Sequence, residues 1–233
     1  MLQSLLQYNF FILSILFLLP GGLIYWLRKD LRKVMQVLAL CSLPFAFTEF
    51  LFYPTYWEPK FLFDLIDVLG FGIEDLLFVI GLSGFTSTSY AFVFHKTLIQ
   101  KTNRGKLSPT RRICLFFVIV CIAISILVRL QMHLIYGAPL LMTILSAFIF
   151  VRRKDLILPG FLGAILSTIM YAMLCYTLIS IYPNIFQLTW HTEKFVNQTW
   201  LGLPAEELVY AFTSGAIASI FYPYVFSFKY SSF

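Results

Sequence analysis

Apolar runs of membrane-spanning length are the feature that most limits how this chain can fold. A helix needs about 20 mostly apolar residues to cross the hydrocarbon core of a bilayer. Seven such runs lie at about residues 5–27, 34–56, 71–95, 113–131, 134–151, 156–182 and 203–228. Because 60% of the residues are hydrophobic and only 12% are charged, a water-soluble domain could not hide this surface. We therefore predict an all-α, polytopic membrane protein with about seven transmembrane helices, since helices satisfy their own backbone in lipid.

The basic residues predict the orientation of these helices. Of the 17 Lys and Arg residues, 14 lie after the first, third and fifth runs or in the tail, and only Lys60, Arg129 and Lys194 lie elsewhere. The 14 are Arg28, Lys29, Arg32, Lys33, Lys96, Lys101, Arg104, Lys106, Arg111, Arg112, Arg152, Arg153, Lys154 and Lys229. Since cytoplasmic loops are enriched in Lys and Arg, we expect the N-terminus outside and the C-terminus in the cytoplasm. This clustering favours a multi-pass protein of the cell (cytoplasmic or inner) membrane and no nucleic-acid partner, despite a net charge of +6.

The acidic residues show the opposite bias. Nine of the 11 fall in the predicted outer half: Glu49, Glu58, Asp64, Asp67, Glu74, Asp75, Glu193, Glu206 and Glu207. Ionised groups are costly at membrane depth, so carboxyl groups retained inside spans indicate a functional site.

The third apolar run aligns with the seventh. The alignment places Gly70 on Gly202, Glu74 on Glu206, Asp75 on Glu207, Tyr90 on Tyr222 and Phe94 on Phe226. Both runs cross the membrane in the same predicted direction, which indicates a parallel internal repeat of three spans, a connector and three spans. We expect one domain over residues 1–233, with pseudo-repeat halves at about 1–112 and 134–233.

Two roles are open for the acid pairs Glu74–Asp75 and Glu206–Glu207. Carboxylates in the first turn of a helix can cap free N–H groups and interact with the helix dipole, and Pro204 is typical of a helix start. Consecutive helical residues point about 100° apart, so one member of a pair can face lipid headgroups while the other faces the bundle. The member that faces inward stays open, because a stripe of small residues follows Glu207 in one half and Glu74 in the other.

A cavity shared by both pairs and Glu49 would crowd several carboxyl groups together. Like charges so placed do not all ionise, so at least one acid would keep a proton and could act as a general acid. Aromatic residues make up 18% of the chain, and rings lining such a cavity would suit a conjugated or cationic species. We interpret most of the four tryptophans (Trp26, Trp57, Trp190 and Trp200) as a lipid-interface belt.

The segments that carry the acid pairs resemble a known family. "PAEELVY" at 204–210, and "GIEDLLF" at 72–78 with Gly72 in place of the proline, are similar to the membrane-integral lycopene (carotenoid) cyclase domain. Proteins with this domain are small heterodimeric subunits in bacteria, fused chains in archaea and fusions to phytoene synthase in fungi. "RKDLRK" at 28–33 and "PFAFTEFLFYPTYWEP" at 44–59 resemble a divergent branch of the fused chains.

The resemblance implies a lycopene β-cyclase-like enzyme, an intramolecular lyase or isomerase. An acid would protonate the terminal double bond of a linear carotene ψ-end, the neighbouring double bond would attack the cation, and loss of a proton would leave a β-ionone ring. It assigns acid/base roles to Glu206 and Glu74, with Glu207, Asp75 and Glu49 in support. Membrane lipid and an apolar polyene or isoprenoid substrate are the expected partners, and no cofactor or metal is expected.

Other functions fit the sequence less well or remain open. A retinal protein would need a lysine deep in a helix, and a membrane prenyltransferase would need two Asp-rich clusters, where this chain has only Asp64 and Asp67 in "DLID". His133, His191 and Glu193 lack metal-ligand spacing. The open alternative is a non-catalytic carotenoid- or lipid-binding membrane protein, or a small transporter.

Overall fold

The computed structural model describes residues 7–101 and 107–232, so Arg104 and Lys106 lie outside the described residues. Within these described ranges, six helical segments are long and apolar enough to cross a membrane: Asn9–Leu27, Lys29–Leu51, Pro109–Arg129, Leu134–Arg152, Lys154–Ile181 and Ala205–Phe226. The predicted all-α, polytopic membrane fold is therefore confirmed.

The elements follow one another in two groups with a connector between them. The first group holds α2 (Asn9–Leu27), η1 (Lys29–Leu31), α3 (Arg32–Ala46), η2 (Phe47–Leu51), η3 (Leu62–Asp64), α4 (Leu65–Leu69), α5 (Ile73–Thr86), α6 (Ser89–Val93) and β1 (Lys96–Gln100). The connector is α7 (Pro109–Arg129). The second group holds α8 (Leu134–Arg152), η4 (Lys154–Leu156), α9 (Ile157–Ile181), α10 (Ile185–Thr189), η5 (Thr192–Lys194), β2 (Thr199–Trp200), β3 (Leu203–Pro204), α11 (Ala205–Phe226) and β4 (Phe228–Ser232).

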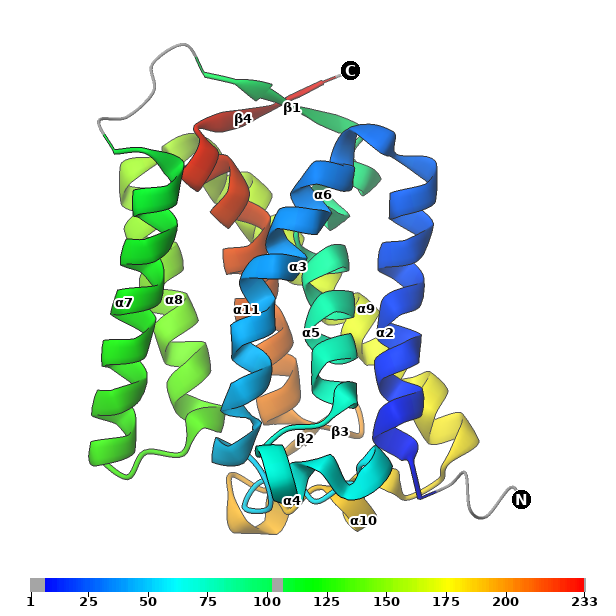
Figure 1. Cartoon of the computed structure of the whole chain (residues 1–233). Helices are drawn as coiled ribbons and strands as arrows, with labels where there is room; N and C mark the ends of the chain where they lie inside the picture. Colours follow the sequence, from blue (N-terminus) through cyan, green and yellow to red (C-terminus); the bar gives the residue numbers. More distant parts are fainter. Residues whose placement is uncertain (1–6, 102–106, 233) are drawn as a thin grey trace.

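The third predicted span is divided rather than continuous. Helix α5 has 14 residues and rises about 21 Å, which is less than the roughly 30 Å core of a bilayer. Ser87 and Thr88 separate it from α6, and the Thr88 hydroxyl donates to the Gly84 carbonyl at 2.7 Å. Together α5 and α6 run from the end of the bundle that carries α4 to the end that carries β1 (Figure 1). The count of seven spans and their orientation stay predictions.

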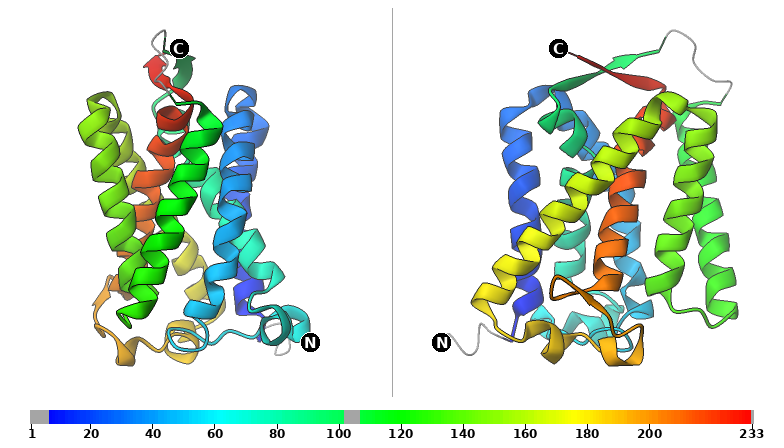
Figure 2. Two further views of the ribbon diagram at one scale, coloured as in Figure 1. Left: turned by 60° about the vertical axis from the view of Figure 1, so that its left-hand side comes forward. Right: turned by 180° about the vertical axis from the view of Figure 1, so that it is seen from behind.

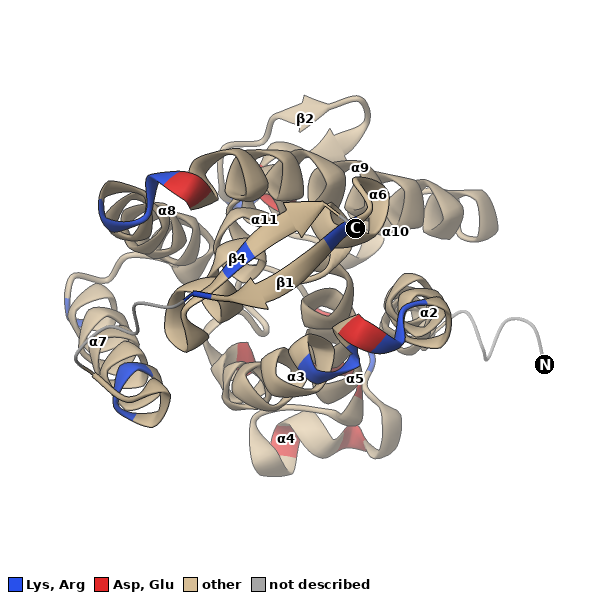
Figure 3. Ribbon diagram, turned by 90° about the horizontal axis from the view of Figure 1, so that it is seen from above, with Lys and Arg blue, Asp and Glu red and all other residues tan. Residues whose placement is uncertain are grey.

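Charge separates the two ends of the bundle. Lys and Arg gather around the β1–β4 strand pair at one end (Figure 3). The acid pairs lie in the first turns of α5 and α11, at the opposite end beside α4, β2 and β3 (Figure 1). This separation follows from the order of basic and acidic loops along the sequence.

Arg28 joins the first group of helices to strand β1. Its guanidinium donates to both carboxylate oxygens of Asp30, at 2.9 and 2.8 Å. The remaining N–H groups donate to the Lys96 carbonyl at 2.7 Å and the Ala91 carbonyl at 3.3 Å. Arg28 therefore donates hydrogen bonds to carbonyl groups near the end of α6 and at the start of β1.

Arg153 makes the same set of contacts in the second group. It donates to both oxygens of Asp155 at 2.8 Å, to the Phe228 carbonyl at 2.6 Å and to the Pro223 carbonyl at 3.4 Å. The alignment that superposes the two acid pairs also places these carbonyl acceptors on those of the first arginine. The antiparallel pairing of β1 with β4 then links the two halves. We propose that the halves are repeats, and the matched arginine contacts support this.

Helix α11 forms the centre of the bundle. In its most apolar window 61% of the residues are buried, against at most 33% in the other five candidate spans. Helix α9 packs along α11 and also contacts α2, α5 and α6, crossing them obliquely (Figure 2). Small residues allow this approach, because a Cβ added at Gly215 would lie 2.5 Å from the Ser167 side chain.

The contact between α2 and α5 depends on Gly81. A Cβ at this position would lie 2.7 Å from the Phe17 carbonyl carbon and 2.9 Å from the Leu18 nitrogen, both of them backbone atoms that cannot rotate away. Because overpacking costs about 1–3 kcal/mol, we expect Gly81→Ala to lower the melting temperature of the detergent-solubilised protein. Gly22→Ala on α2 is the matched control, because its Cβ would meet no atom within 4 Å. Equal melting temperatures of the two variants would contradict this packing.

Candidate active site

Three carboxyl groups from segments far apart in the sequence meet at one cavity. Glu49 in η2, Asp75 in α5 and Glu207 in α11 line a cavity of about 90 Å³. All three side chains are buried, with at most 8% of their surface exposed. The cavity lies at the acidic end of the bundle among apolar helices, and the burial of the three side chains shields them from bulk water.

A left-handed glycine precedes each acid pair and sets the start of its helix. Gly70 has a φ of +75° and Gly202 a φ of +78°, values that side chains with a Cβ rarely adopt. Each glycine turns the chain back into the bundle, so that α5 starts at Ile73 and α11 at Ala205. The equivalent turns place the two acid pairs at the same depth.

Glu207 accepts hydrogen bonds from three buried donors. The Tyr56 hydroxyl donates to Oε1 at 2.8 Å and the Trp190 indole N–H donates to the same oxygen at 2.9 Å. The Tyr171 hydroxyl donates to Oε2. Both carboxylate oxygens are therefore occupied, which fixes the orientation of Glu207 toward the cavity.

Tyr56 is held as a hydrogen-bond donor. Its burial, and after that the negative charge of Glu207, raise the pKa of the Tyr56 hydroxyl well above its usual value. The phenol therefore keeps its proton across the pH range in which proteins fold. Since Tyr56 belongs to the first half of the chain and Glu207 to the second, their bond also joins the two halves.

Glu49 and Asp75 form a second arrangement of carboxyl groups in the same cavity. Glu49 accepts from the Trp57 indole N–H at 2.6 Å, and Asp75 accepts from the Gly72 backbone N–H at 2.7 Å. Both carboxyl groups line the same cavity of about 90 Å³. Carboxyl groups crowded into one water-poor cavity do not all ionise, so this pair can hold a transferable proton.

The first acid of each pair turns away from the cavity toward a loop. Glu74 accepts from the Leu62 backbone N–H at 2.7 Å, and Glu206 accepts from the Val196 backbone N–H at 3.1 Å. In each, the second carboxyl oxygen, Oε2, is buried and has no hydrogen-bond partner among the described residues. In both halves, then, the second acid of the pair faces the cavity and the first binds a loop. In the sequence, a stripe of small residues follows Glu207 in one half but Glu74 in the other. These stripes therefore could not show which acid of each pair faces the cavity.

Aromatic rings form most of the cavity wall. The rings of Trp57 and Trp190 lie 5.2 Å apart, and Phe10 packs edge-on against Trp57 at 4.3 Å. The interface-belt interpretation therefore does not hold for these two tryptophans, whereas Trp26 and Trp200 are 72% and 51% exposed. Aromatic rings beside buried carboxyl groups create a region that can stabilise a positive charge.

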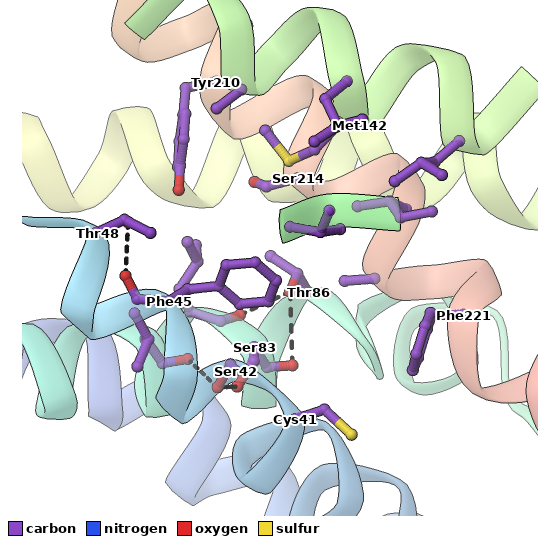
Figure 4. Close-up of a pocket in the computed structure, with 18 of the residues that line it drawn as sticks. Cys41, Ser42, Phe45, Thr48, Ser83, Thr86, Met142, Tyr210, Ser214 and Phe221 are labelled. Atoms are coloured by element: carbon purple, nitrogen blue, oxygen red, sulfur yellow. Dashed lines mark hydrogen bonds between the residues drawn. The ribbon is translucent and has the colours of Figure 1, made fainter. Parts of the chain in front are cut away.

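An apolar cavity of about 180 Å³ adjoins the acidic one. It lies between α3 and α5 on one side and α7, α8 and α11 on the other, and Tyr210 projects into it (Figure 4). Five residues line both cavities: Phe45, Thr48, Phe52, Val79 and Tyr210. Its serine and threonine hydroxyl groups bond to the protein, as Ser42 does to Ser83 at 3.1 Å. The two cavities together offer an apolar chamber with carboxyl groups at one end.

His191 and the acids around it do not form a metal site. His191 contacts Glu58 at 3.5 Å and Glu193 at 3.7 Å on the surface, and His133 instead packs against the Phe195 ring. Across residues 7–101 and 107–232, no group of three or more His, Cys, Asp or Glu side chains is placed to hold a metal ion.

The donors to Glu207 escaped the sequence-based prediction. Tyr171 lies inside the apolar run 156–182, where a hydroxyl needs a partner, so its position was a usable signal. Nothing in the local sequence distinguishes Tyr56 or Trp190 from interface aromatics, because their partner lies far along the chain.

The hydrogen bonds to Glu207 predict an unusual pattern of stability. Glu207→Leu leaves three buried donors without an acceptor. Each unpaired donor lowers the free energy of unfolding by about 1–3 kcal/mol, so we expect a lower melting temperature in detergent. Adding Tyr56→Phe and Tyr171→Phe to this variant removes two of the stranded hydroxyl groups and recovers part of the loss. Glu193→Gln, whose parent side chain is 61% exposed, serves as the control and leaves the melting temperature unchanged. A triple variant less stable than Glu207→Leu would contradict the proposed network.

The second half of this chain matches a known family. Residues 133–225, from the start of α8 to the last turn of α11, match the family model described as Lycopene cyclase. No curated protein and no solved structure matches the chain. The matched region includes Glu206 and Glu207, so the resemblance seen in "PAEELVY" is confirmed. The match supports membership of this chain in the lycopene cyclase family.

Proposed function

We propose that this protein closes the ψ-ends of a linear carotene to β-ionone rings by acid catalysis, without net oxidation or reduction. The observation that carries the proposal is the meeting of Glu49, Asp75 and Glu207 at an aromatic-walled cavity that adjoins an apolar one. The family match supports a carotenoid cyclase-like function in general.

The reaction needs one proton given and one taken. Protonation of the terminal double bond produces a tertiary cation, and the electron pair of the neighbouring double bond forms the ring bond. Loss of a proton from the ring then restores a double bond, so that substrate and product are isomers. An apolar chamber excludes water, which would otherwise capture the cation.

We assign the proton donor to the Glu49–Asp75 pair. Two carboxyl groups that share one small cavity hold a proton beside it, and general-acid transfer from a positioned carboxyl group typically contributes 10²–10⁴-fold to a rate. The Trp57 and Gly72 N–H groups stay bonded to these side chains and fix their orientation. The donor is therefore positioned before the substrate binds.

We assign stabilisation of the cation to Glu207 and the surrounding rings. Both oxygens of Glu207 accept hydrogen bonds, so neither needs a proton of its own. A fixed carboxylate in a water-excluded cavity interacts strongly with a developing positive charge. The rings of Trp57, Trp190 and Phe78 line the same cavity and add to this stabilisation.

Pigment chemistry tests the proposal. In a bacterium that accumulates red lycopene, we expect the wild-type chain to produce yellow-orange ringed carotenes, separable by chromatography. Asp75→Asn, Glu49→Gln and Glu207→Gln each reduce ring formation by about 100-fold or more at equal protein level. Glu58→Gln, on a surface side chain that is 57% exposed, retains activity. If lycopene instead co-purifies with the wild-type protein unchanged, the chain is a carotenoid-binding protein and the cyclase proposal fails.

A second set of variants distinguishes the acids of each pair. Glu74 and Glu206, which the resemblance favours as acid/base groups, bind loop N–H groups through one oxygen. Glu74→Gln and Glu206→Gln keep that acceptor, so we expect them to retain most of the ring formation that Asp75→Asn and Glu207→Gln lose. If Glu74→Gln and Glu206→Gln abolish ring formation at normal protein levels, the acid/base roles belong to the first member of each pair.

A further inference from the structure

A cavity larger than the two at the proposed active site lies at the basic end of the bundle, and cyclisation makes no use of it. It has a volume of about 920 Å³ and lies between α7, α8 and the last turns of α11. Four basic side chains belong to its lining: Lys101, Arg112, Arg152 and Arg153. The described lining contains no acidic residue, which gives this cavity an excess of positive charge.

Two of the basic residues are fixed by the protein and two are not. Arg112 donates to the Tyr224 carbonyl at 2.8 Å and to the Ser227 hydroxyl at 3.2 Å, and Arg153 is bonded to Asp155. Lys101 lies 3.8 Å from Asp155, at the limit of an ion pair. Asp155 thus pairs with Arg153 and Lys101, and no described carboxylate pairs with Arg112 or Arg152, which leaves positive charge for an external anion.

Arg152 is the most accessible of the four. Its side chain is exposed and its guanidinium lies 4.6 Å from the centre of the Phe148 ring. The structure gives it no carboxylate partner among the described residues. A guanidinium held over a ring retains N–H groups that can bind phosphate oxygens.

The walls below this basic rim are apolar. Seven of the lining residues form them: Leu115, Phe116, Ile119, Ile144, Leu145, Phe148 and Phe221. From Arg112 to Ile119 the wall extends along α7 for about 10 Å, as helix geometry dictates. Several of these side chains, including Ile119 and Ile144, are exposed on the surface that faces lipid.

We propose that this cavity binds an anionic phospholipid. The phosphate would lie among Lys101, Arg112 and Arg152, and an acyl chain would lie against the α7 and α8 wall. A free phosphate would use the basic rim but leave the apolar wall uncovered, whereas a zwitterionic lipid would bring no net charge to the four cations. The rim faces the predicted cytoplasmic leaflet, where anionic lipids are held by Lys and Arg clusters.

Thermal unfolding in detergent tests this site without measuring cyclisation. We expect dioleoyl phosphatidylglycerol to raise the melting temperature of the wild-type protein, because a ligand that binds only the folded state stabilises it. Dioleoyl phosphatidylcholine and inorganic phosphate at the same concentrations produce no comparable rise. A rise with inorganic phosphate alone, or an equal rise with both lipids, would overturn the proposal.

Charge variants locate the effect. The double variant Lys101→Gln/Arg152→Gln leaves the structural arginines in place and weakens phosphatidylglycerol binding by roughly 30-fold, read from the lipid concentration that gives half of the thermal shift. Lys154→Gln, an exposed cation at the same end that does not line the cavity, keeps the wild-type response. Ile144→Trp fills the apolar wall and reduces the response to phosphatidylglycerol. Wild-type affinity in the double variant would exclude this cavity as the site.

Discussion

The cost of burying carboxyl groups in an apolar bundle determines the arrangement of the acidic end. An acid there must find donors, share a proton or bind a backbone N–H group, because no bulk water is present to solvate it. Glu207 has Tyr56, Tyr171 and Trp190 as donors, and Glu49 has Trp57. The requirement for partners brings together loops and helices from both halves of the chain, and it leaves Glu49, Asp75 and Glu207 facing one cavity.

The proposed repeat explains why this chamber has acids on two sides. The glycine turns, the acid pairs and the arginine contacts recur in both halves, and Trp57 and Trp190 lie opposite each other in an antiparallel bridge. The halves differ in the partner of the inward acid. Asp75 accepts from one backbone N–H and shares the cavity with Glu49, whereas Glu207 accepts from three side-chain donors. Such a difference between equivalent positions lets one side hold a proton and the other a negative charge, which are the two functions that the proposed reaction requires.

The fold was largely predictable and the site only in part. Apolar runs identified the long helices, and the charge of the loops separated a basic end from an acidic end. The break at Ser87 and Thr88 was missed, because both residues sit within a run whose overall hydropathy suits a continuous helix. The β1–β4 pair was also missed, since its strands lie far apart in the sequence and have no local turn to mark them. Glu49, Asp75 and Glu207 were all among the candidate residues, but the resemblance gave the leading roles to the first acid of each pair, whose side chain binds a loop.

The sequence by itself determined that the chain is an apolar helical bundle with carboxyl groups concentrated at one end, because hydropathy and charge are sums over local residues. Tertiary structure alone decided which acid of each pair faces the chamber. Adjacent helical residues point about 100° apart, so the choice depends on how far each helix is rotated about its axis. Contacts such as that of Gly81 with the Phe17 backbone set this rotation, and these contacts join residues that no local pattern connects.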